Sequence, residues 1–323
     1  MIMKKFWWLV TTAVIASAFT FVFFNEKKKE SLPIVAIANY GPLKDLELSI
    51  QGIKNELSDN GFVDGQTIKI EIADIACDLS LIPQIIAKLK NCNPMVMVLV
   101  STPIAQFARE KIRDIPLVYD AVTDPVAAGL IDGSRPGNNI TGSSDMQDLG
   151  ILLKFVKTIF PNAKAIGLPY LTAESNDTAL LKMMERAAPD FGLSVVPIPV
   201  DQMRDVSIRM QGVSGKVDCI YVGAGGLLAA MPAIAAEAQK MGVPVFGAED
   251  LAVRDGLALA SYGVNTESVG RNAGKLVAKL LSGIDIKMLA PICPKSTDHM
   301  CVVNKKLAKK FGIRIPKNAT LVE

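Results

Sequence analysis

The sequence predicts an α/β protein of two Rossmann-like lobes, each built on a parallel β-sheet covered by helices. Apolar strand-like segments alternate with amphipathic helix-like segments, which is typical of parallel sheets with right-handed crossovers. The same order of segments occurs twice, and a Pro-containing strand at 115–118 has a counterpart at 243–246. Half of the residues are apolar but only 6% are aromatic, which favours helices packed on parallel sheets over a β-sandwich. We therefore expect a cleft between the strand ends of two lobes.

The length of 323 residues is sufficient for two domains. We expect a signal peptide or N-terminal membrane anchor with a linker over residues 1–32. The first lobe is expected at 33–141 and 263–285, and the second at 142–262 and 286–323. The chain must then cross between the lobes several times, because a helix near 267–281 returns to the first lobe. That helix carries two small residues, Gly270 and Gly274.

The N-terminal segment carries an export signal. Lys4 and Lys5 precede an unbroken apolar run at 6–24, and three lysines follow it at 27–29. The run resembles a signal-peptide core with a candidate cleavage site at residues 16–18. It is also long enough to span a bilayer, and we favour an uncleaved anchor. Either interpretation places the rest of the chain outside the cytoplasm, in the periplasm or on the outer face of the inner membrane.

The charge of the chain does not indicate a nucleic-acid partner. The formal net charge is +3. The five lysines of the N-terminal segment, set against Glu26 and Glu30, account for all of it. The remainder is neutral, and a nucleic-acid-binding domain would need a basic face.

The first half of the chain alternates strands and helices from residue 33 onward. Apolar residues at helical spacing predict a helix at 45–60, and Gly61 is placed to end it. The expected strands lie at 33–39, 67–75, 95–100, 116–119 and 139–141. The other expected helices lie at 79–89 and 103–111.

The second half repeats this pattern. A helix at 178–191 is ended by Gly192, as the first helix is by Gly61. The expected strands lie at 163–168, 193–200, 217–222 and 243–246. The other expected helices lie at 232–241, 267–281 and 305–311.

Polar residues that follow the expected strands are the candidates for a ligand site, because open α/β sheets bind ligands at the carboxyl ends of their strands. Ser101 and Thr102 open a helix, where free backbone N–H groups and two hydroxyls suit a carboxylate. Capping of helices is the alternative for Ser101, Thr102, Asp124 and Asp145. The candidate ligand-binding residues are Tyr40, Ser101, Thr102, Thr123, Asp124, Ser143, Ser144, Asp145, Tyr170, Asn176 and Glu249.

No motif in the sequence indicates an enzyme, a cofactor or a metal. The glycines at 223–226 lack the spacing of a dinucleotide-binding loop, and there is no Walker lysine. A single histidine, His299, excludes a Ser/His/Asp triad, and no Cys/His spacing suggests zinc. We therefore expect no catalytic residue, cofactor or metal. The alternative is a carboxylate-dependent enzyme that uses Asp124 with Asp145 or Glu249.

The five cysteines leave at least one unpaired. Cys219 lies in an apolar strand and is expected to be a buried thiol. Cys77 and Cys92 stand at opposite ends of a strand–helix–strand unit, too far apart for easy bridging. Cys293 and Cys301 flank a polar turn and form the expected disulfide in an oxidising compartment.

Several sequence blocks resemble one known family. They are PLV at 116–118, AVTDPVAAGL at 121–130, RPGNNITG at 135–142, FPNAK at 160–164, GKVDCIYV at 215–222 and GRNAG at 270–274. In these blocks the chain resembles the exported substrate-binding proteins of ABC importers, specifically the family assigned to tryptophan and tyrosine transport. The resemblance covers essentially everything after the linker. The chain departs from the family pattern at two places. The loop at 39–41 is unusual, and residues 223–225 are Gly-Ala-Gly where family members often carry a polar triplet.

The resemblance implies a type I periplasmic binding fold, whose two lobes are joined by three crossings and close by hinge motion. It also implies an amino acid ligand, with a preference for an aromatic one, and an ABC permease in the membrane as partner. Ser101, Thr102, Ser143 and Ser144 would then hold the ligand carboxylate, and Asp124, Asp145 or Glu249 its ammonium. Tyr40 and Tyr170 would sandwich its ring, although a packing role for both tyrosines, an aliphatic amino acid and another metabolite remain open. The alternative function is an extracytoplasmic ligand sensor.

Overall fold

The computed structural model describes residues 32–323 except 137 and 318. The expected export signal at 6–24 lies outside the described residues. Residues 34–323 form a single compact unit, which contains every element named below. Of the helices in the described part of the chain, none combines the length and the apolar character needed to cross a membrane.

The first sheet is parallel throughout, with the strand order β2-β1-β3-β4-β5. Its strands are β1 (Ile34–Asn39), β2 (Lys69–Asp74), β3 (Val96–Val100), β4 (Leu117–Val122) and β5 (Ile140–Ser144). In β3 every side chain is buried, because helices cover both faces of a parallel sheet.

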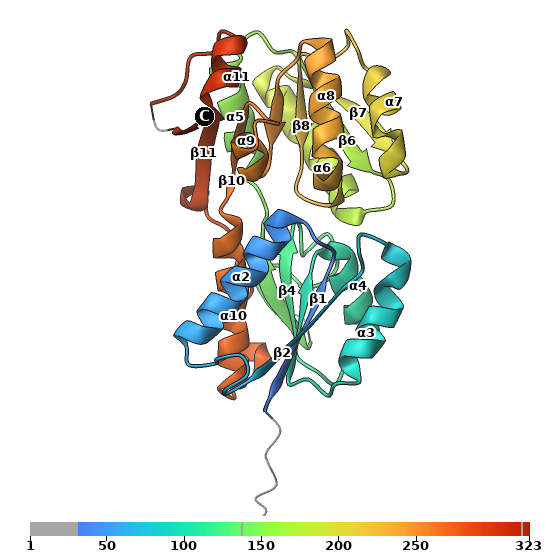
Figure 1. Cartoon of the computed structure of the whole chain (residues 1–323), viewed down its shortest axis with the longest axis vertical. Helices are drawn as coiled ribbons and strands as arrows, with labels where there is room; N and C mark the ends of the chain where they lie inside the picture. Colours follow the sequence, from blue (N-terminus) through green and yellow to red (C-terminus); the bar gives the residue numbers. More distant parts are fainter. Residues whose placement is uncertain (1–31, 137, 318) are drawn as a thin grey trace, which may run out of the picture. The chain divides into compact units, whose positions relative to one another are not determined.

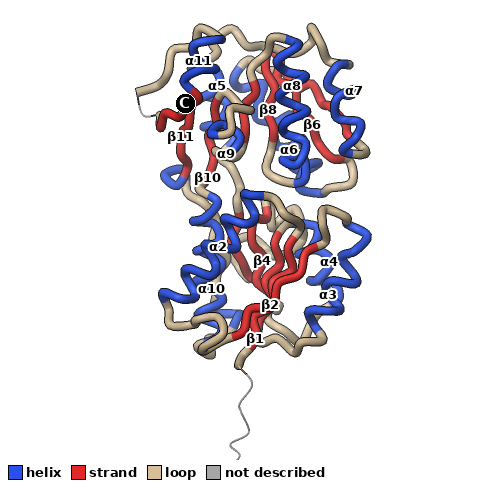
Figure 2. The backbone as a smooth tube through the Cα atoms, in the orientation of Figure 1, coloured by secondary structure: helices blue, strands red, loops and turns tan. Residues whose placement is uncertain are grey.

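Helices cover both faces of the first sheet (Figures 1 and 2). The helices α3 (Ile82–Lys90) and α4 (Thr102–Lys111) pack on one face. The helices α2 (Lys44–Asp59) and α10 (Thr266–Leu281) pack on the other. The sheet is thus the middle layer of a three-layer lobe.

The second sheet has seven strands in the order β12-β11-β10-β9-β8-β6-β7. They are β6 (Ala165–Leu171), β7 (Ser194–Val200), β8 (Cys219–Val222), β9 (Val245–Gly247), β10 (Ala260–Val264), β11 (His299–Asn304) and β12 (Thr320–Val322). The strands from β6 to β10 are parallel, whereas β11 runs antiparallel to β10. The expected α/β fold with mostly parallel sheets is therefore confirmed.

Helices also cover both faces of the second sheet. On one face lie α5 (Leu149–Ile159), α6 (Ser175–Ala187) and α11 (Lys305–Lys310). On the other lie α7 (Val206–Gln211), α8 (Met231–Met241) and α9 (Leu251–Arg254). Its first five strands in chain order repeat the arrangement of the first sheet, with the second strand at an edge beside the first. In both sheets the order reverses between the first and third strands, the point at which open α/β sheets bind ligands.

The helices α2 and α10 approach closely because small residues lie between them. A Cβ atom added to Gly270 of α10 would overlap the backbone carbonyl of Ser49 in α2. A Cβ atom on Gly52 of α2 would overlap the carbonyl of Glu267 in the same way. No side chain fits at either position without moving one helix.

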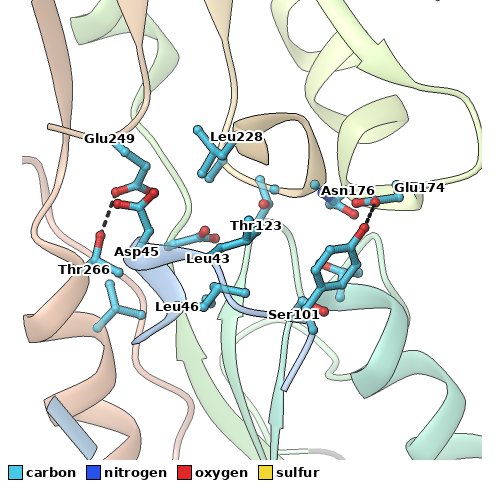
Figure 3. Close-up of a pocket in the computed structure, with 18 residues that line it drawn as sticks. Leu43, Asp45, Leu46, Ser101, Thr123, Glu174, Asn176, Leu228, Glu249 and Thr266 are labelled. Carbon is cyan, nitrogen blue, oxygen red and sulfur yellow. Dashed lines mark hydrogen bonds between the residues drawn. The ribbon is translucent and has the colours of Figure 1, made fainter. Parts of the chain in front are cut away.

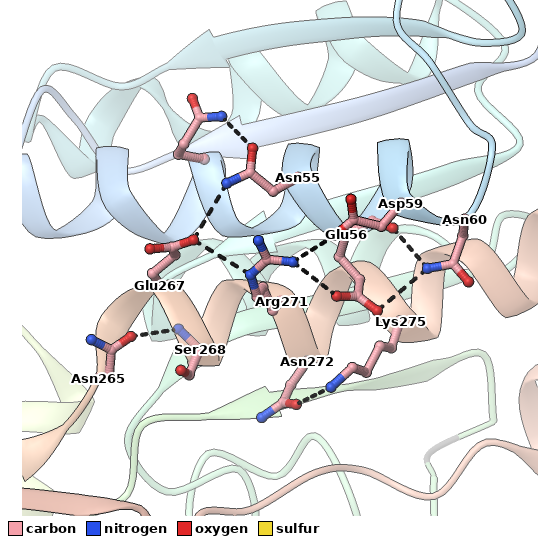
Figure 4. A network of polar contacts seen from close by, with 11 residues as sticks. Asn55, Glu56, Asp59, Asn60, Asn265, Glu267, Ser268, Arg271, Asn272 and Lys275 are labelled. Carbon is pink, nitrogen blue, oxygen red and sulfur yellow. Dashed lines mark hydrogen bonds and ion pairs between the residues drawn. The ribbon is translucent and has the colours of Figure 1, made fainter.

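Arg271 holds the polar edge of this helix pair (Figure 4). Its guanidinium Nη1 lies 3.3 Å from Glu56 and 2.9 Å from Asp59, both on α2. Its Nε lies 3.4 Å from Glu267, one turn earlier on α10. The arginine thereby ties α10 to α2 on the outer side of the first lobe.

The chain passes between the two sheets three times: after β5, after β10, and between the short helix η5 (Ile286–Met288) and β11. Leu289 and Ile292 pack in the core of the first lobe, and Ser144 N–H donates to Ile292 O at 2.9 Å. The first lobe therefore extends to 144 and to 292, a few residues beyond the expected limits at 141 and 285.

The expected disulfide between Cys293 and Cys301 is not formed, and all five cysteines are free thiols. Cys301 is buried in β11 and packs in the core of the second lobe, whereas Cys293 is exposed. Segment 299–304 is a strand rather than the end of a loop, and its pairing with β10 fixes where Cys301 points. Cys219 is the buried thiol that the sequence predicts.

Candidate functional site

A pocket lies between the carboxyl ends of the strands of both sheets (Figure 3). The space between its walls, including its opening to solvent, is about 570 Å³. The first lobe supplies Tyr40, Leu43, Asp45, Leu46, Ser101, Thr102, Ala121, Thr123 and Asp145. The rest of the lining comes from Glu174, Asn176, Ala224, Gly225, Gly226, Leu228, Glu249, Thr266 and Val269.

Most strands that reach this edge contribute a residue within three positions of their ends. In the first lobe Tyr40 follows β1, Ser101 follows β3 and Asp145 follows β5. In the second lobe Glu174 follows β6, and Glu249 follows β9. The repeated strand order thus brings equivalent loops of the two lobes to one cavity.

Ser101 is held in a strained backbone conformation beside the pocket. Its φ is 92°, which L-amino acids rarely adopt and which costs about 1–3 kcal/mol. Its side chain does not cap α4, which was the expected alternative, and its Oγ is buried without a hydrogen-bond partner among the residues that the structure describes. Its backbone N–H donates to Asp120 O at 3.0 Å, so the hydroxyl is the group of Ser101 that is left to meet a ligand.

Four buried carboxyl groups line the pocket, and Glu174, 3% exposed, is the one that contacts Tyr40. Asp45 is 8% exposed, Asp145 8% and Glu249 5%. Burial raises the pKa of Asp45 to about 6, with nearby Asp250 and Asp255 adding to the shift. Burial also raises the pKa of Asp145 to about 6. The pKa of Glu249 is raised well above its usual value by burial and then by Asp45.

At the other side of the pocket, where Figure 3 labels Glu174, this residue of the second lobe contacts Tyr40 of the first. The Tyr40 hydroxyl donates to Glu174 Oε1 at 2.5 Å. Burial, followed by the charge of Glu174, raises the pKa of Tyr40, so the tyrosine stays a neutral donor. A Cβ atom on Gly226 would lie 2.5 Å from Glu174 Oε1 and 2.7 Å from the Tyr40 hydroxyl, so a larger residue at this position would force one of these two side chains to move.

Four polar atoms of the pocket-lining residues are buried without a partner among the described residues. They are Asp45 Oδ1, Ser101 Oγ, Asp145 Oδ1 and Asn176 Oδ1. Buried polar groups are almost always hydrogen-bonded, so a cluster of unsatisfied ones marks a place where a ligand supplies the partners.

Seven of the eleven sequence-predicted residues line the pocket: Tyr40, Ser101, Thr102, Thr123, Asp145, Asn176 and Glu249. Asp124 does not, because it accepts hydrogen bonds from the N–H groups of Val126 and Ala127 and shapes the turn after β4. That is the capping-type role that the sequence left open for it.

The other three predicted residues also lie outside the pocket. Ser143 is fully buried within β5. Ser144 is buried at the end of β5, where its Oγ accepts from Met146 N–H. Tyr170 lies within β6 opposite Pro199 of β7, so it cannot sandwich a ring with Tyr40. Tyr40 itself is engaged by Glu174.

The sequence did not single out Asp45, Glu174 or Thr266. Asp45 is in the first turn of α2, where acidic residues are ordinary. Thr266 follows β10, and its hydroxyl donates to Glu249 Oε2 at 2.6 Å. Its strand was not predicted, although a threonine between a strand and a helix is the same signal that selected Thr102.

The pocket has no arrangement typical of a metal site. Within the described residues, no group of three or more His, Cys, Asp or Glu side chains is placed to hold a metal ion. His299 lies outside the pocket, where Nε2 accepts from Asp148 N–H and the ring stacks on Tyr262.

Residues 31–322 match the family model of ABC transporter substrate binding proteins. The chain is 31% identical over 261 residues to a tyrosine-binding protein of Clostridioides difficile, a match that covers 80% of this chain and 74% of the relative. The fold resembles an ABC domain from Streptococcus pneumoniae in complex with L-Trp, with a TM-score of 0.85 at 26% identity, covering 91% of this chain and all of the other.

A ligand-free, open substrate-binding protein with adhesive properties from Clostridium difficile matches with a TM-score of 0.69 at 30% identity. That match covers 90% of this chain and 99% of the other. The family model spans nearly the whole described chain, and the C. difficile relative is matched over most of its length. This chain therefore belongs to the family of ABC transporter substrate-binding proteins.

Proposed function

We propose that this chain is the exported solute-binding component of an ABC importer, and that it binds an aromatic amino acid between its lobes and delivers it to a membrane permease. The observation that carries this proposal is the pocket at the strand ends of both lobes, with its four unpartnered polar atoms. A cleft closed by two lobes sequesters a small ligand without any chemical step.

The pocket has the groups that an amino acid needs. The hydroxyls of Ser101 and Thr102 and the first turn of α4 suit the carboxylate. The buried carboxyls of Asp145 and Glu249 suit the ammonium group. Apolar side chains of Leu43, Leu46, Leu228 and Val269 complete the wall and suit an apolar side chain.

The comparisons support the aromatic preference. The C. difficile relative is a tyrosine-binding protein, and the S. pneumoniae structure holds L-Trp. This chain matches the Trp-bound structure better than the ligand-free, open one, although its identity to the open protein is higher. That difference favours an arrangement of the lobes that is near the ligand-bound one.

A calorimetric screen of the full chain in mild detergent against the twenty amino acids tests the proposal. We expect tyrosine or tryptophan to bind with the highest affinity. Failure of phenylalanine, tyrosine and tryptophan to bind at millimolar concentration would contradict the aromatic assignment.

We also propose that the protein does not convert its ligand. No histidine, lysine or cysteine is among the described residues that line the pocket, and Asp124 lies outside it. Incubation of the bound ligand with the chain, followed by mass analysis, should return the ligand unchanged. Turnover that disappears on Asp145→Asn would overturn this proposal.

A further inference from the structure

Besides Glu174, which accepts from the Tyr40 hydroxyl, three buried carboxyls line the pocket, and they come from three different parts of the fold. Asp45 belongs to α2 of the first lobe, Asp145 follows β5 at a crossing, and Glu249 follows β9 of the second lobe. Figure 3 shows the side chains of Asp45 and Glu249 next to each other, although they come from opposite lobes. Closing the pocket therefore brings acidic groups of both lobes together.

The protein supplies almost nothing to neutralise this cluster. None of the residues that line the pocket is a lysine, an arginine or a histidine. Lys44, the neighbour of Asp45, pairs instead with Asp255 at 3.1 Å on the exposed surface. One oxygen each of Asp45 and Asp145 has no partner in the described part of the chain, and Glu249 accepts from the Thr266 hydroxyl.

Buried carboxylates without a counter-charge are costly, because each loses its hydration and gains no ion pair. A ligand cation placed between Asp45 and Glu249 removes that cost and the repulsion between the lobes. The site binds the ligand carboxylate less strongly than the ammonium, because only neutral donors, such as the Ser101 hydroxyl and the first turn of α4, are available to the carboxylate.

We infer that the site is selective for the ammonium group of its ligand, which Asp45, Asp145 and Glu249 hold together, and that aromatic amines without a carboxylate are ligands as well. This inference rests on the proposed function, because it concerns the same pocket. An organic cation is favoured over a metal ion, since no metal-binding group of side chains occurs among the described residues.

Three analogues of one ring test the inference on the full chain in mild detergent. Calorimetry compares tyrosine, tyramine, which lacks the carboxylate, and 3-(4-hydroxyphenyl)propanoate, which lacks the ammonium. We expect tyramine to bind within about tenfold of tyrosine, and the propanoate to bind at least about 30-fold more weakly, as loss of one partner of a buried charge pair predicts.

The variant Asp45→Asn should weaken tyrosine and tyramine by about 30-fold or more. Its matched control is Glu47→Gln, which removes an exposed carboxyl from the same turn of α2 and should leave both affinities unchanged. If Asp45→Asn does not fold, as judged by thermal unfolding, Glu249→Gln replaces it with the same expected result.

The outcomes separate this inference from the proposed function. Tyrosine binding without tyramine binding overturns the inference and leaves the proposed function standing, as does binding of the propanoate as tightly as tyrosine. Tyramine binding without binding of tyrosine or tryptophan supports the inference and overturns the amino acid assignment. If no analogue binds, both are overturned.

Discussion

The hydroxyl of Tyr40 donates a 2.5 Å hydrogen bond to the carboxylate of Glu174, and this contact links equivalent positions of the two lobes. Tyr40 follows β1, the first strand of one sheet, and Glu174 follows β6, the first strand of the other. Both side chains are 3% exposed. A second interlobe contact lies nearby, where Ser175 Oγ donates to Gln106 Oε1 at 2.7 Å. We interpret the Tyr40–Glu174 pair as a contact that forms when the lobes close.

Replacing Tyr40 with phenylalanine should weaken ligand binding. A buried hydrogen bond to a charged group contributes about 1.5–3 kcal/mol, which corresponds to about 10- to 100-fold in affinity when the bond forms only in the closed state. Titration calorimetry with tyrosine measures the loss. Tyr170→Phe is the control, because that hydroxyl lies outside the pocket. An affinity within twofold of the parent for Tyr40→Phe would count against a closing contact.

A methyl group at position 226 should block the same contact. In Gly226→Ala the Cβ atom would lie 2.5 Å from Glu174 Oε1 and 2.7 Å from the Tyr40 hydroxyl, so one of the two must move. We expect ligand affinity to fall by at least about tenfold, the loss of one such hydrogen bond. Thermal unfolding of the ligand-free chain should change little, since the lobes can remain open.

The control for Gly226→Ala is Gly212→Ala. Gly212 ends α7 at a φ of −62°, which alanine adopts readily, and it lies outside the pocket. If both variants bind tyrosine equally well, the space beside the Tyr40–Glu174 contact is not required for binding.

The packing of α2 against α10 predicts a different effect for Gly270→Ala. Its new Cβ would overlap the backbone of Ser49, which cannot move without shifting α2. Overpacking of this kind costs about 1–3 kcal/mol of the free energy of unfolding. Urea denaturation measures the loss. Lys275→Ala, an exposed change on the same helix, should leave stability nearly unchanged, and equal stabilities of the two variants would contradict close packing at this point.

The parallel core of each lobe could be predicted from the sequence because its signals are local. Val96–Val100 is a continuous apolar run, as expected of a strand buried on both faces. Gly192 ends its helical segment with a φ of 65°, the left-handed conformation that glycine favours. The strands β10 to β12 were not predicted. Ser261 and Gly263 interrupt the apolar pattern of β10, and β11 is defined by antiparallel pairing with it.

Part of the pocket could also be predicted from the sequence, because some of its residues are placed by their position relative to strand ends. Ser101, Asp145 and Glu249 follow strands, so their position along the chain is enough to place them at the ligand edge. Tyr170 was expected in the loop after a strand that ends at 168, but β6 continues past it to Leu171. Tyr170 is therefore part of the strand, where its position decides which face of the sheet its side chain meets. The role of Asp45 depends on the approach of the second lobe, and no local pattern reports such a contact.

The raised pKa values of the pocket carboxyls predict how stability depends on pH without ligand. A carboxyl of an unfolded chain titrates near 4, whereas Asp45 and Asp145 in the folded chain titrate at about 6. The folded state therefore binds protons more tightly between about pH 4 and 6. Its stability falls as pH rises through this window, and the loss persists above it. The pKa values of buried Asp120 and Asp177 are about 7 and 8, so the loss of stability continues to higher pH.

Ligand binding should show the opposite dependence on pH. The ammonium group of the ligand pairs with ionised carboxylates, so its affinity should rise as pH increases from about 5 to 7.5 and deprotonates Asp45 and Asp145. Calorimetry with tyrosine across this range measures the trend, and thermal unfolding of the ligand-free chain at the same pH values provides the comparison. Asp45→Asn should flatten the rise, whereas Glu47→Gln, with its exposed carboxyl on the same helix, should preserve it. An affinity for tyrosine that is constant or falls over this range would show that these carboxyls do not hold the cation.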